Sequence, residues 1–119
     1  MKILIVDDEE LDLFINKKLL SLAFETEGFT SVKDTIHWAQ QNDFDVAIID
    51  YYLGPGIYAN HLLKELVAIK GPTFKAFVVS NYVDGKQALD LKESGFMDII
   101  YKPLTLEIFK MKLNIAPPM

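Results

Sequence analysis

Apolar residues along the chain follow two patterns that alternate with one another. Short runs rich in β-branched and aromatic residues occur at 2–6, 30–33, 45–50, 75–80 and 98–101. Between them, apolar residues recur every three or four positions at 11–22, 35–41, 57–69, 84–94 and 105–113. The first pattern is typical of strands, and the second is typical of helices that bury one face. The sequence therefore predicts five strand–helix units in succession.

Three of the predicted strands, 2–6, 45–50 and 75–80, are almost continuously apolar instead of alternating. Strands of this kind are covered on both faces, as in a parallel sheet with helices above and below it. Five units in a row predict an α/β, doubly wound domain. If the strands, numbered along the chain, lie in the order 2-1-3-4-5, the first and third are neighbours at the point where the order reverses.

The first helical segment carries an apolar stripe that we expect to face the core, and Gly28 is expected to stop this helix. The stripe consists of Leu11, Phe14, Ile15, Leu19, Leu20 and Leu22. The tail APPM (116–119) is expected to follow the last helix. A length of 119 residues suits one compact domain, so residues 1–119 are expected to fold as a single unit.

The composition narrows the classes of function. The net charge is −5, and the twelve basic residues are all lysines. Arginine is the usual bidentate reader of guanine and phosphate, and nucleic acid repels an acidic chain, so direct DNA or RNA binding is not expected. The absence of cysteine excludes disulfides and thiolate metal sites. The sequence shows no signal segment and no membrane-spanning run, which predicts a soluble cytoplasmic protein.

Polar residues collect at the carboxyl ends of the predicted strands. Asp7 and Asp8 follow the first strand, and Asp50 ends the third. Ser80 ends the fourth strand, and Lys102 follows the fifth. In open parallel sheets this edge, at the reversal of strand order, is where ligands bind. With the first and third strands adjacent, the three aspartates would meet in one crevice.

Three carboxylates so close together stay ionised only if a cation joins them. All-oxygen ligands in a shallow, partly hydrated site favour Mg²⁺, and the chain has no EF-hand spacing that would indicate Ca²⁺. A lysine ammonium across the crevice would balance charge and hold a phosphate, and a serine hydroxyl would supply a rotatable donor. Together these groups predict phosphoryl transfer with a carboxylate as the nucleophile.

Four short motifs carry a resemblance to a known family. They are VDDEE (6–10), IIDYYL (48–53), VVSN (78–81) and YKP (101–103). In this order they resemble the motifs of response regulator receiver domains of bacterial two-component signalling, of the single-domain chemotaxis-regulator type, over nearly the whole chain. The intervals of 42, 30 and 22 residues between Asp8, Asp50, Ser80 and Lys102 also fall where that family places them. The resemblance implies a flavodoxin-like (βα)5 fold.

The resemblance also implies a role for each matching residue. Asp50 would be the nucleophile that becomes an aspartyl phosphate, and Lys102 would pair first with Asp50 and then with its phosphoryl group. Ser80 would swing inward to donate a hydrogen bond to a phosphoryl oxygen, pulling its loop with it. The Lys102–Pro103 peptide bond is expected to be cis, because only proline makes that isomer accessible.

A Mg²⁺ site follows from the same resemblance. Asp8 would bind the ion directly and Asp7 mainly through water. Asp50 and the backbone carbonyl oxygen of Tyr52 would be the other protein ligands. In this scheme the protein is a phosphoacceptor that promotes its own phosphorylation and dephosphorylation, and it is not a turnover enzyme.

The partners implied by the resemblance are proteins. A sensor histidine kinase or a histidine phosphotransfer protein would donate the phosphoryl group, and a downstream protein would receive the signal, without direct contact with nucleic acid or membrane. Segments 84–94, 98–101 and 105–113 form the usual partner face in this family, and a dimer through that face is a further expectation. Candidate contact residues there are Gln87, Leu91, Tyr101 and Phe109.

Several positions depart from the family pattern. Asn81 is larger than the usual Ala or Gly after the Ser/Thr, and the loop LGPGIYAN (53–60) replaces the usual Met-Pro and Asp-Gly, with Tyr58 where glycine is common. Tyr52 and Tyr82 flank the site where many relatives carry polar side chains. We expect these two aromatic rings to shield the phosphate and to lengthen its life.

Ile99 stands where the family has its switch aromatic, and Tyr101 is expected to point to the opposite face of the strand. These departures leave one alternative open, a degenerate receiver that acts as a phosphorylation-independent interaction module. A second alternative is a phosphatase or phosphotransferase that turns over through an aspartyl phosphate. That chemistry usually needs a second acid two residues after the nucleophile, where this chain has Tyr52.

Overall fold

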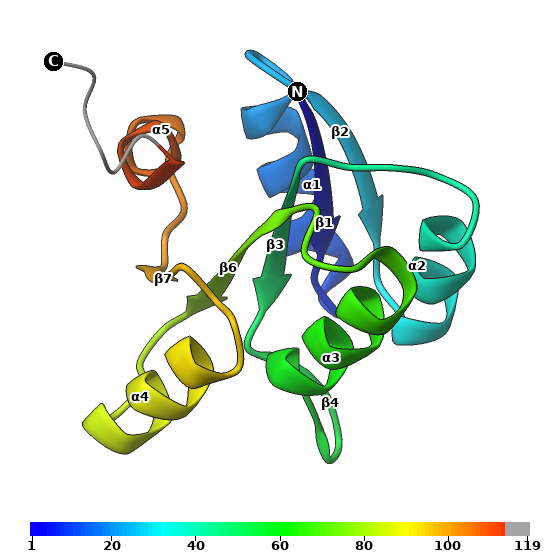
Figure 1. Ribbon diagram of the computed structural model, residues 1–119. Coiled ribbons are helices and arrows are strands. Elements are labelled where there is room, and N and C mark those ends of the chain that lie inside the picture. The colour runs from blue at the N-terminus through cyan, green and yellow to red at the C-terminus, as the bar shows by residue number, and fades with distance from the viewer. Residues whose placement is uncertain (114–119) are drawn as a thin grey trace, which may run out of the picture.

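The computed structural model describes residues 1–113, and the predicted tail at 116–119 lies outside them. Its centre is a five-stranded parallel sheet in the order β2-β1-β3-β6-β7 (Figure 1). Its strands are β1 (Lys2–Val6), β2 (Glu25–Phe29), β3 (Val46–Asp50), β6 (Lys75–Ser80) and β7 (Asp98–Tyr101). The helices are α1 (Glu10–Leu20), α2 (Val32–Ala39), α3 (Ala59–Lys70), α4 (Gly85–Glu93) and α5 (Leu106–Leu113). The predicted doubly wound α/β fold and its strand order are therefore confirmed.

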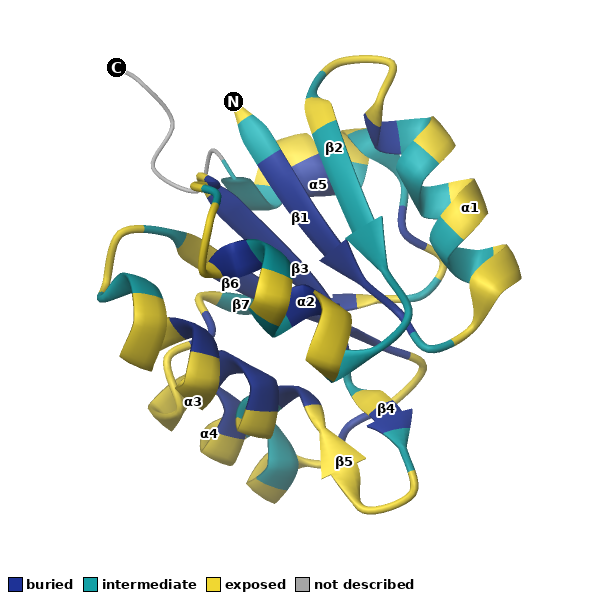
Figure 2. Ribbon diagram, turned by 90° about the vertical axis from the view of Figure 1, so that its right-hand side faces the viewer, coloured by how far each residue is buried: buried dark blue, intermediate teal, exposed yellow. Residues whose placement is uncertain are grey.

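An apolar layer covers each face of this sheet. Ile3 and Ile5 of β1 belong to the cluster packed under α1 and α5, whereas Leu4 and Val6 belong to the cluster under α2, α3 and α4. Successive side chains of a strand point to opposite faces of the sheet. Because both faces are covered, the side chains of β1 and β3 are buried on both sides (Figure 2). This double burial explains why these strands read as continuous apolar runs.

The second strand lies earlier in the chain than predicted. Residues 30–33, predicted as a strand, instead form a bend and the start of α2, and β2 spans Glu25–Phe29. The Ser31 hydroxyl accepts a hydrogen bond from the N–H of Asp34 at 3.1 Å, which starts α2 three residues before the expected position. Because β2 is an edge strand whose residues are exposed or partly buried, it has no apolar run that a sequence pattern could detect.

The orientation of α1 differs from the prediction. Gly28 does not stop the helix but lies in β2, where a β-carbon would come within 2.7 Å of Leu13 Cδ1. This close approach turns the Leu13 side of α1 onto the sheet. The expected core stripe is therefore wrong for residues whose exposed fractions run from 51% to 78%, namely Leu11, Phe14, Ile15 and Leu22. Leu20 is buried as predicted, and Leu19 packs against the same cluster.

A hairpin that the sequence did not predict connects β3 with α3. β4 (Tyr52–Gly54) pairs antiparallel with β5 (Ile57–Tyr58), so α3 begins two residues later than expected. Gly54 and Gly56 at this turn have φ values of 143° and 73°, which side-chain-bearing residues rarely adopt. The ends of α4 and α5 agree with the prediction to within one residue. Among residues 1–113, no helix has the length and apolar character needed to cross a bilayer.

Candidate functional site

The acidic residues singled out in the sequence gather at the carboxyl edge of the sheet. Residues 3–6 of β1 pair in parallel with residues 46–49 of β3, which brings Asp7 and Asp8 beside Asp50. One carboxylate oxygen from each of these three aspartates lies within 4.8 Å of the others. Three oxygen ligands at this spacing suit one divalent cation. The donor set therefore fits the metal site predicted from the sequence.

Asp7 is the most deeply buried member of this cluster, with 2% of its surface exposed. Its backbone N–H donates to the carbonyl oxygen of Phe29 at 3.1 Å, and its Oδ1 accepts from the N–H of Glu9 at 3.0 Å. Burial raises the pKa of Asp7 to about 6, although the bond from Glu9 opposes the rise, and the negative charge of Asp50 adds to it. The carboxylate form of Asp7 is thus disfavoured until a cation binds nearby.

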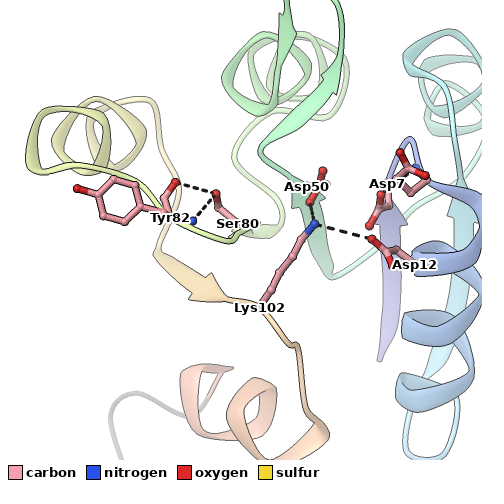
Figure 3. Close-up of polar contacts among 7 residues, drawn as sticks. Asp7, Asp12, Asp50, Ser80, Tyr82 and Lys102 are labelled. Atoms are coloured by element: carbon pink, nitrogen blue, oxygen red, sulfur yellow. Dashed lines mark hydrogen bonds and ion pairs between the residues drawn. The ribbon is translucent and has the colours of Figure 1, made fainter.

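Asp50 pairs with Lys102 across the crevice. Lys102 Nζ lies 2.9 Å from Asp50 Oδ1 (Figure 3). Burial raises the pKa of Asp50, the bond and charge of Lys102 oppose this, and the charges of Asp8 and Asp12 reinforce it. Burial lowers the pKa of Lys102, but the acids around it, Asp50 first, outweigh that effect and raise the pKa. Burial therefore dominates the pKa shift of Asp50, whereas the surrounding carboxylates dominate the pKa shift of Lys102.

Ser80 ends β6 and is buried, but its hydroxyl bonds within its own loop. Ser80 Oγ donates to the carbonyl oxygen of Tyr82 at 3.1 Å and accepts from the N–H of Tyr82 at 3.3 Å (Figure 3). The structure therefore places Ser80 at the predicted edge with its hydroxyl turned to Tyr82. To reach a phosphoryl group on Asp50, the hydroxyl has to exchange these two bonds for a new one.

Tyr52 lies two residues after Asp50 on the hairpin, where aromatic rings gather. Ring centroids are 5.3 Å apart for Tyr51 and Tyr58 and 5.9 Å apart for Tyr52 and Tyr58, and the ring of His61 lies 6.1 Å from Tyr58. Tyr52 remains 45% exposed beside the site, whereas Tyr82 on the other side is 73% exposed. The role of the Tyr52 carbonyl oxygen as a metal ligand stays a prediction.

The position of the family's switch aromatic is part of the core. Ile99 is buried with the residues beneath α3 and α4. Tyr101 lies two residues further along β7, so strand alternation puts it on the same face as Ile99, and the expectation of opposite faces is wrong. Tyr101 is nevertheless half exposed at the end of the strand, where it does not fill the place of a buried aromatic.

Two of the candidate contact residues on the α4–β7–α5 face are unsuitable. Leu91 and Phe109 are buried in the two core clusters, so they cannot contact a partner without unfolding their helices. Gln87 is partly exposed and Tyr101 is exposed, as contacts require. The Lys102–Pro103 peptide bond is cis, as predicted.

Sequence reasoning missed one acidic residue of the site, Asp12. Its Oδ2 lies 3.9 Å from Lys102 Nζ (Figure 3), and it lines a cleft of about 480 Å³. The other residues of the cleft wall are Ile15, Asn16, Val79, Asn81, Lys102, Pro103 and Leu104. The available signal was an acid between two leucines, four residues after Asp8.

Comparisons with known proteins agree with the fold described above. A response regulator receiver domain from Methylobacillus flagellatus is 27% identical, with a TM-score of 0.81 and 97% of each chain covered. A Burkholderia pseudomallei response regulator with a phosphorylated aspartic acid, a calcium ion and citrate is 18% identical, with a TM-score of 0.83 over 94% of this chain and 65% of that one.

Among curated proteins, a cyclic di-GMP phosphodiesterase of Thermotoga maritima is 27% identical over 98% of this chain. The chain spans only 31% of the length of that relative. The family model described as the response regulator receiver domain matches residues 3–114. Together with the doubly wound sheet and the acidic edge described above, this match shows that the chain belongs to the response regulator receiver domain family.

Proposed function

We propose that residues 1–119 form one two-component receiver that accepts a phosphoryl group on Asp50. The observation that carries this proposal is the ammonium of Lys102, 2.9 Å from the Asp50 carboxylate and beside the cluster of three aspartates. An anionic nucleophile, a fixed cation and a divalent-cation site together are what phosphoryl transfer requires. The family membership supports the same reading.

The metal in this proposal is Mg²⁺. Asp8, Asp50 and the carbonyl oxygen of Tyr52 would bind it directly, and Asp7 would bind it mainly through water. When bound, Mg²⁺ would neutralise the clustered acids and withdraw charge from the phosphoryl oxygens. The raised pKa values of Asp7 and Asp50 support this assignment, since burial first and neighbouring acids second disfavour their charged forms, and a bound cation would offset both effects.

The phosphoryl donor is a phosphohistidine on a sensor histidine kinase or a histidine phosphotransfer protein. One carboxylate oxygen of Asp50 attacks phosphorus, the histidine N–P bond breaks, and the released imidazole nitrogen takes a proton from water. Lys102 then pairs with the phosphoryl group, and Ser80 leaves Tyr82 to donate a hydrogen bond to it. Dephosphorylation is a hydrolysis: water attacks phosphorus, inorganic phosphate leaves, and the Asp50 carboxylate is restored.

Signal output in this proposal passes through protein contacts. The movement of Ser80 and its loop shifts a conformational equilibrium next to α4, and the face of α4, β7 and α5 meets a downstream protein or a second copy of the chain. The net charge of −5 and the absence of arginine favour protein partners over nucleic acid or membrane, and we propose that the protein meets these partners in the cytoplasm. The protein acts as a phosphoacceptor and not as a turnover enzyme.

The test is the intact mass of the protein after incubation with acetyl phosphate, with and without Mg²⁺. We expect one added phosphoryl group that requires Mg²⁺, that is lost in Asp50→Asn, and that persists in Asp34→Asn, where the same change falls on an exposed helix. No adduct, in a folded protein that gains no stability from Mg²⁺, would favour a degenerate receiver that works as an interaction module.

A further inference from the structure

Lys102 lies between two carboxylates that come from different elements. Its Nζ is 2.9 Å from Asp50 Oδ1 on β3 and 3.9 Å from Asp12 Oδ2 on α1 (Figure 3). Asp50 is buried, whereas the Asp12 side chain is 47% exposed. The ammonium is therefore shared between an acid inside the crevice and an acid at its mouth.

Asp12 stands apart from the cation cluster. The cluster contains Asp7, Asp8 and Asp50, and Asp12 instead lines the cleft of about 480 Å³ together with Lys102 and Asn81. Any molecule that approaches the ammonium through this cleft passes the Asp12 carboxylate. A negative charge at this place acts on the ammonium and on an arriving ligand at the same time.

The charge of Asp12 has opposite effects on the two kinds of ligand. A divalent cation at the aspartate cluster gains from one more negative charge nearby. A phosphoryl group on Asp50 gains nothing from it, because it is repelled by Asp12 and has to compete with Asp12 for the same ammonium. A carboxylate at this position therefore favours the cation and weakens the hold on the phosphoryl group.

We propose that Asp12 is a positioning residue for Lys102: by sharing the ammonium with Asp50, it limits the affinity of the site for the phosphoryl group and strengthens the affinity for the divalent cation. This inference rests on the proposed function, since it concerns how tightly the same site holds phosphate. It adds a residue of α1 to the groups that set this balance.

The test compares two dissociation constants in wild type and Asp12→Asn. One is the constant for Mg²⁺ alone, by calorimetry, and the other is the constant for beryllofluoride, a phosphoryl mimic, at saturating Mg²⁺, by NMR. In Asp12→Asn we expect Mg²⁺ to bind up to about fivefold more weakly and beryllofluoride to bind up to about fivefold more tightly, the range for partly exposed charge pairs. A general structural defect would weaken both.

Two matched variants distinguish the effect of a charge at position 12 from the effect of the protein's net charge. Glu10→Gln removes one negative charge from an exposed position on the same helix, and both constants should stay close to wild type. Asp12→Glu keeps the charge, and both constants should return toward wild type. With acetyl phosphate as donor, Asp12→Asn should lower the KM more than it changes the maximal rate, because the donor is itself an anion.

Three outcomes would overturn the inference. These are unchanged or weaker beryllofluoride binding in Asp12→Asn, equal effects of Glu10→Gln and Asp12→Asn, and failure of Asp12→Glu to restore the constants in a folded protein. The proposed function fails by a different observation, in which the wild type binds no beryllofluoride and forms no adduct with acetyl phosphate. In that case the pairing of Asp12 with Lys102 can still be tested without any ligand. The measurement compares the NMR chemical shifts of the Lys102 ε-methylene group in wild type and Asp12→Asn.

Discussion

The backbone N–H of Lys102 donates a hydrogen bond to the carbonyl oxygen of Ser80 at 2.9 Å. The bond follows directly on the pairing of Ser80 with Tyr101, so it extends the β6–β7 ladder by one residue. It ties the two main chains together while the side chains have different partners, Asp50 for Lys102 and Tyr82 for Ser80. A change of partner by the Ser80 hydroxyl therefore alters the loop after β6 and leaves β7 in place.

Replacement of Ser80 by alanine tests this coupling. Ser80→Ala loses both bonds to Tyr82, which costs about 1 kcal/mol of the unfolding free energy, and it has no hydroxyl to offer the phosphoryl group. We expect beryllofluoride still to bind, but the amide signals of residues 81–83 to move much less than in wild type. Ser94→Ala, which removes a hydroxyl bonded to Asp90 on α4, is the control. Equal movement of the 81–83 signals in wild type and Ser80→Ala would contradict the coupling.

Removal of the Lys102 charge should affect both the reaction and the fold. In Lys102→Met the buried Asp50 carboxylate loses its 2.9 Å partner, and phosphorylation by acetyl phosphate should slow by about a hundredfold. The unfolding free energy at pH 7 should fall by about 2 kcal/mol, the range for a hydrogen bond to a charged group. Lys112→Met breaks an ion pair of the same length with Asp98 far from the site, so it should leave the rate unchanged. A rate in Lys102→Met that matched the control would count against the proposed role.

The pKa of Asp7 predicts a pH dependence of stability in metal-free protein. Because the folded pKa is raised from 3.8 to about 6, the folded state holds this proton more tightly than the unfolded chain. The stability that Asp7 contributes to the folded state is therefore fully present below about pH 4. It is lost as the pH rises through about 6, which lowers the unfolding free energy by up to about 3 kcal/mol. Urea unfolding at several pH values in EDTA measures it.

The variant Asp7→Asn isolates this effect, since its amide oxygen can still accept the hydrogen bond from Glu9. Without metal it should be more stable than wild type at pH 7.5 and equal to it near pH 4. Added Mg²⁺ should stabilise wild type more than Asp7→Asn, which keeps the direct ligands but lacks one negative charge beside the ion. A difference between the two proteins that stays constant across this pH range would show that Asp7 is not held at a raised pKa.

The lifetime of the phosphate should depend on the two tyrosines beside the site. In Tyr52→Ala and Tyr82→Ala, water reaches the phosphoryl group more easily, and we expect its loss to be about threefold faster in each. The measurement is the decay of the phosphorylated mass after the donor is removed. Tyr101→Ala removes an exposed ring at the end of β7 and should not change the decay. A lifetime that is unchanged in both variants would mean that neither ring shields the phosphate.

The contact between α1 and β2 predicts a strong effect at Gly28. A β-carbon there would meet Leu13 Cδ1 at 2.7 Å, so Gly28→Ala should overpack this contact and lower the unfolding free energy by about 1–3 kcal/mol. Gly85→Ala, at the start of α4, meets nothing within 4 Å and should be neutral or stabilising by up to about 1 kcal/mol. Urea unfolding of both variants measures these changes. An unfolding free energy of Gly28→Ala equal to that of wild type would show that α1 can move away from β2 without cost.

The location of the candidate site could be predicted because the site lies at the ends of strands that the sequence marks clearly. β1, β3 and β6 are buried on both faces, so their apolar runs locate Asp7, Asp50 and Ser80 directly. The parallel order of these strands then brings the acids together without any information on side-chain contacts. Lys102 follows from the same reasoning at the end of β7.

The misplaced elements have a common physical cause. β2 is a partly exposed edge strand, so no apolar run distinguishes Glu25–Phe29 from a loop. α1 carries apolar residues on both of its sides, and tertiary contacts such as that of Leu13 with Gly28 accompany the burial of one side. Asp12 was missed for the same reason, because its place beside Lys102 depends on how α1 is rotated. Tertiary contacts between segments fixed these features, and a local pattern does not contain them.

The central position of β3 has a consequence for how a phosphate on Asp50 would be lost. β3 lies between β1 and β6, and Asp50 is its last residue. Backbone amides of a strand with neighbours on both sides exchange with solvent only through openings that approach global unfolding. An acyl phosphate on Asp50 would therefore be attached to a segment that we expect to exchange slowly, and local fraying would not release it to bulk water. Its decay measures the chemistry of the native state, so it should respond to side chains around the site and not to modest changes in overall stability.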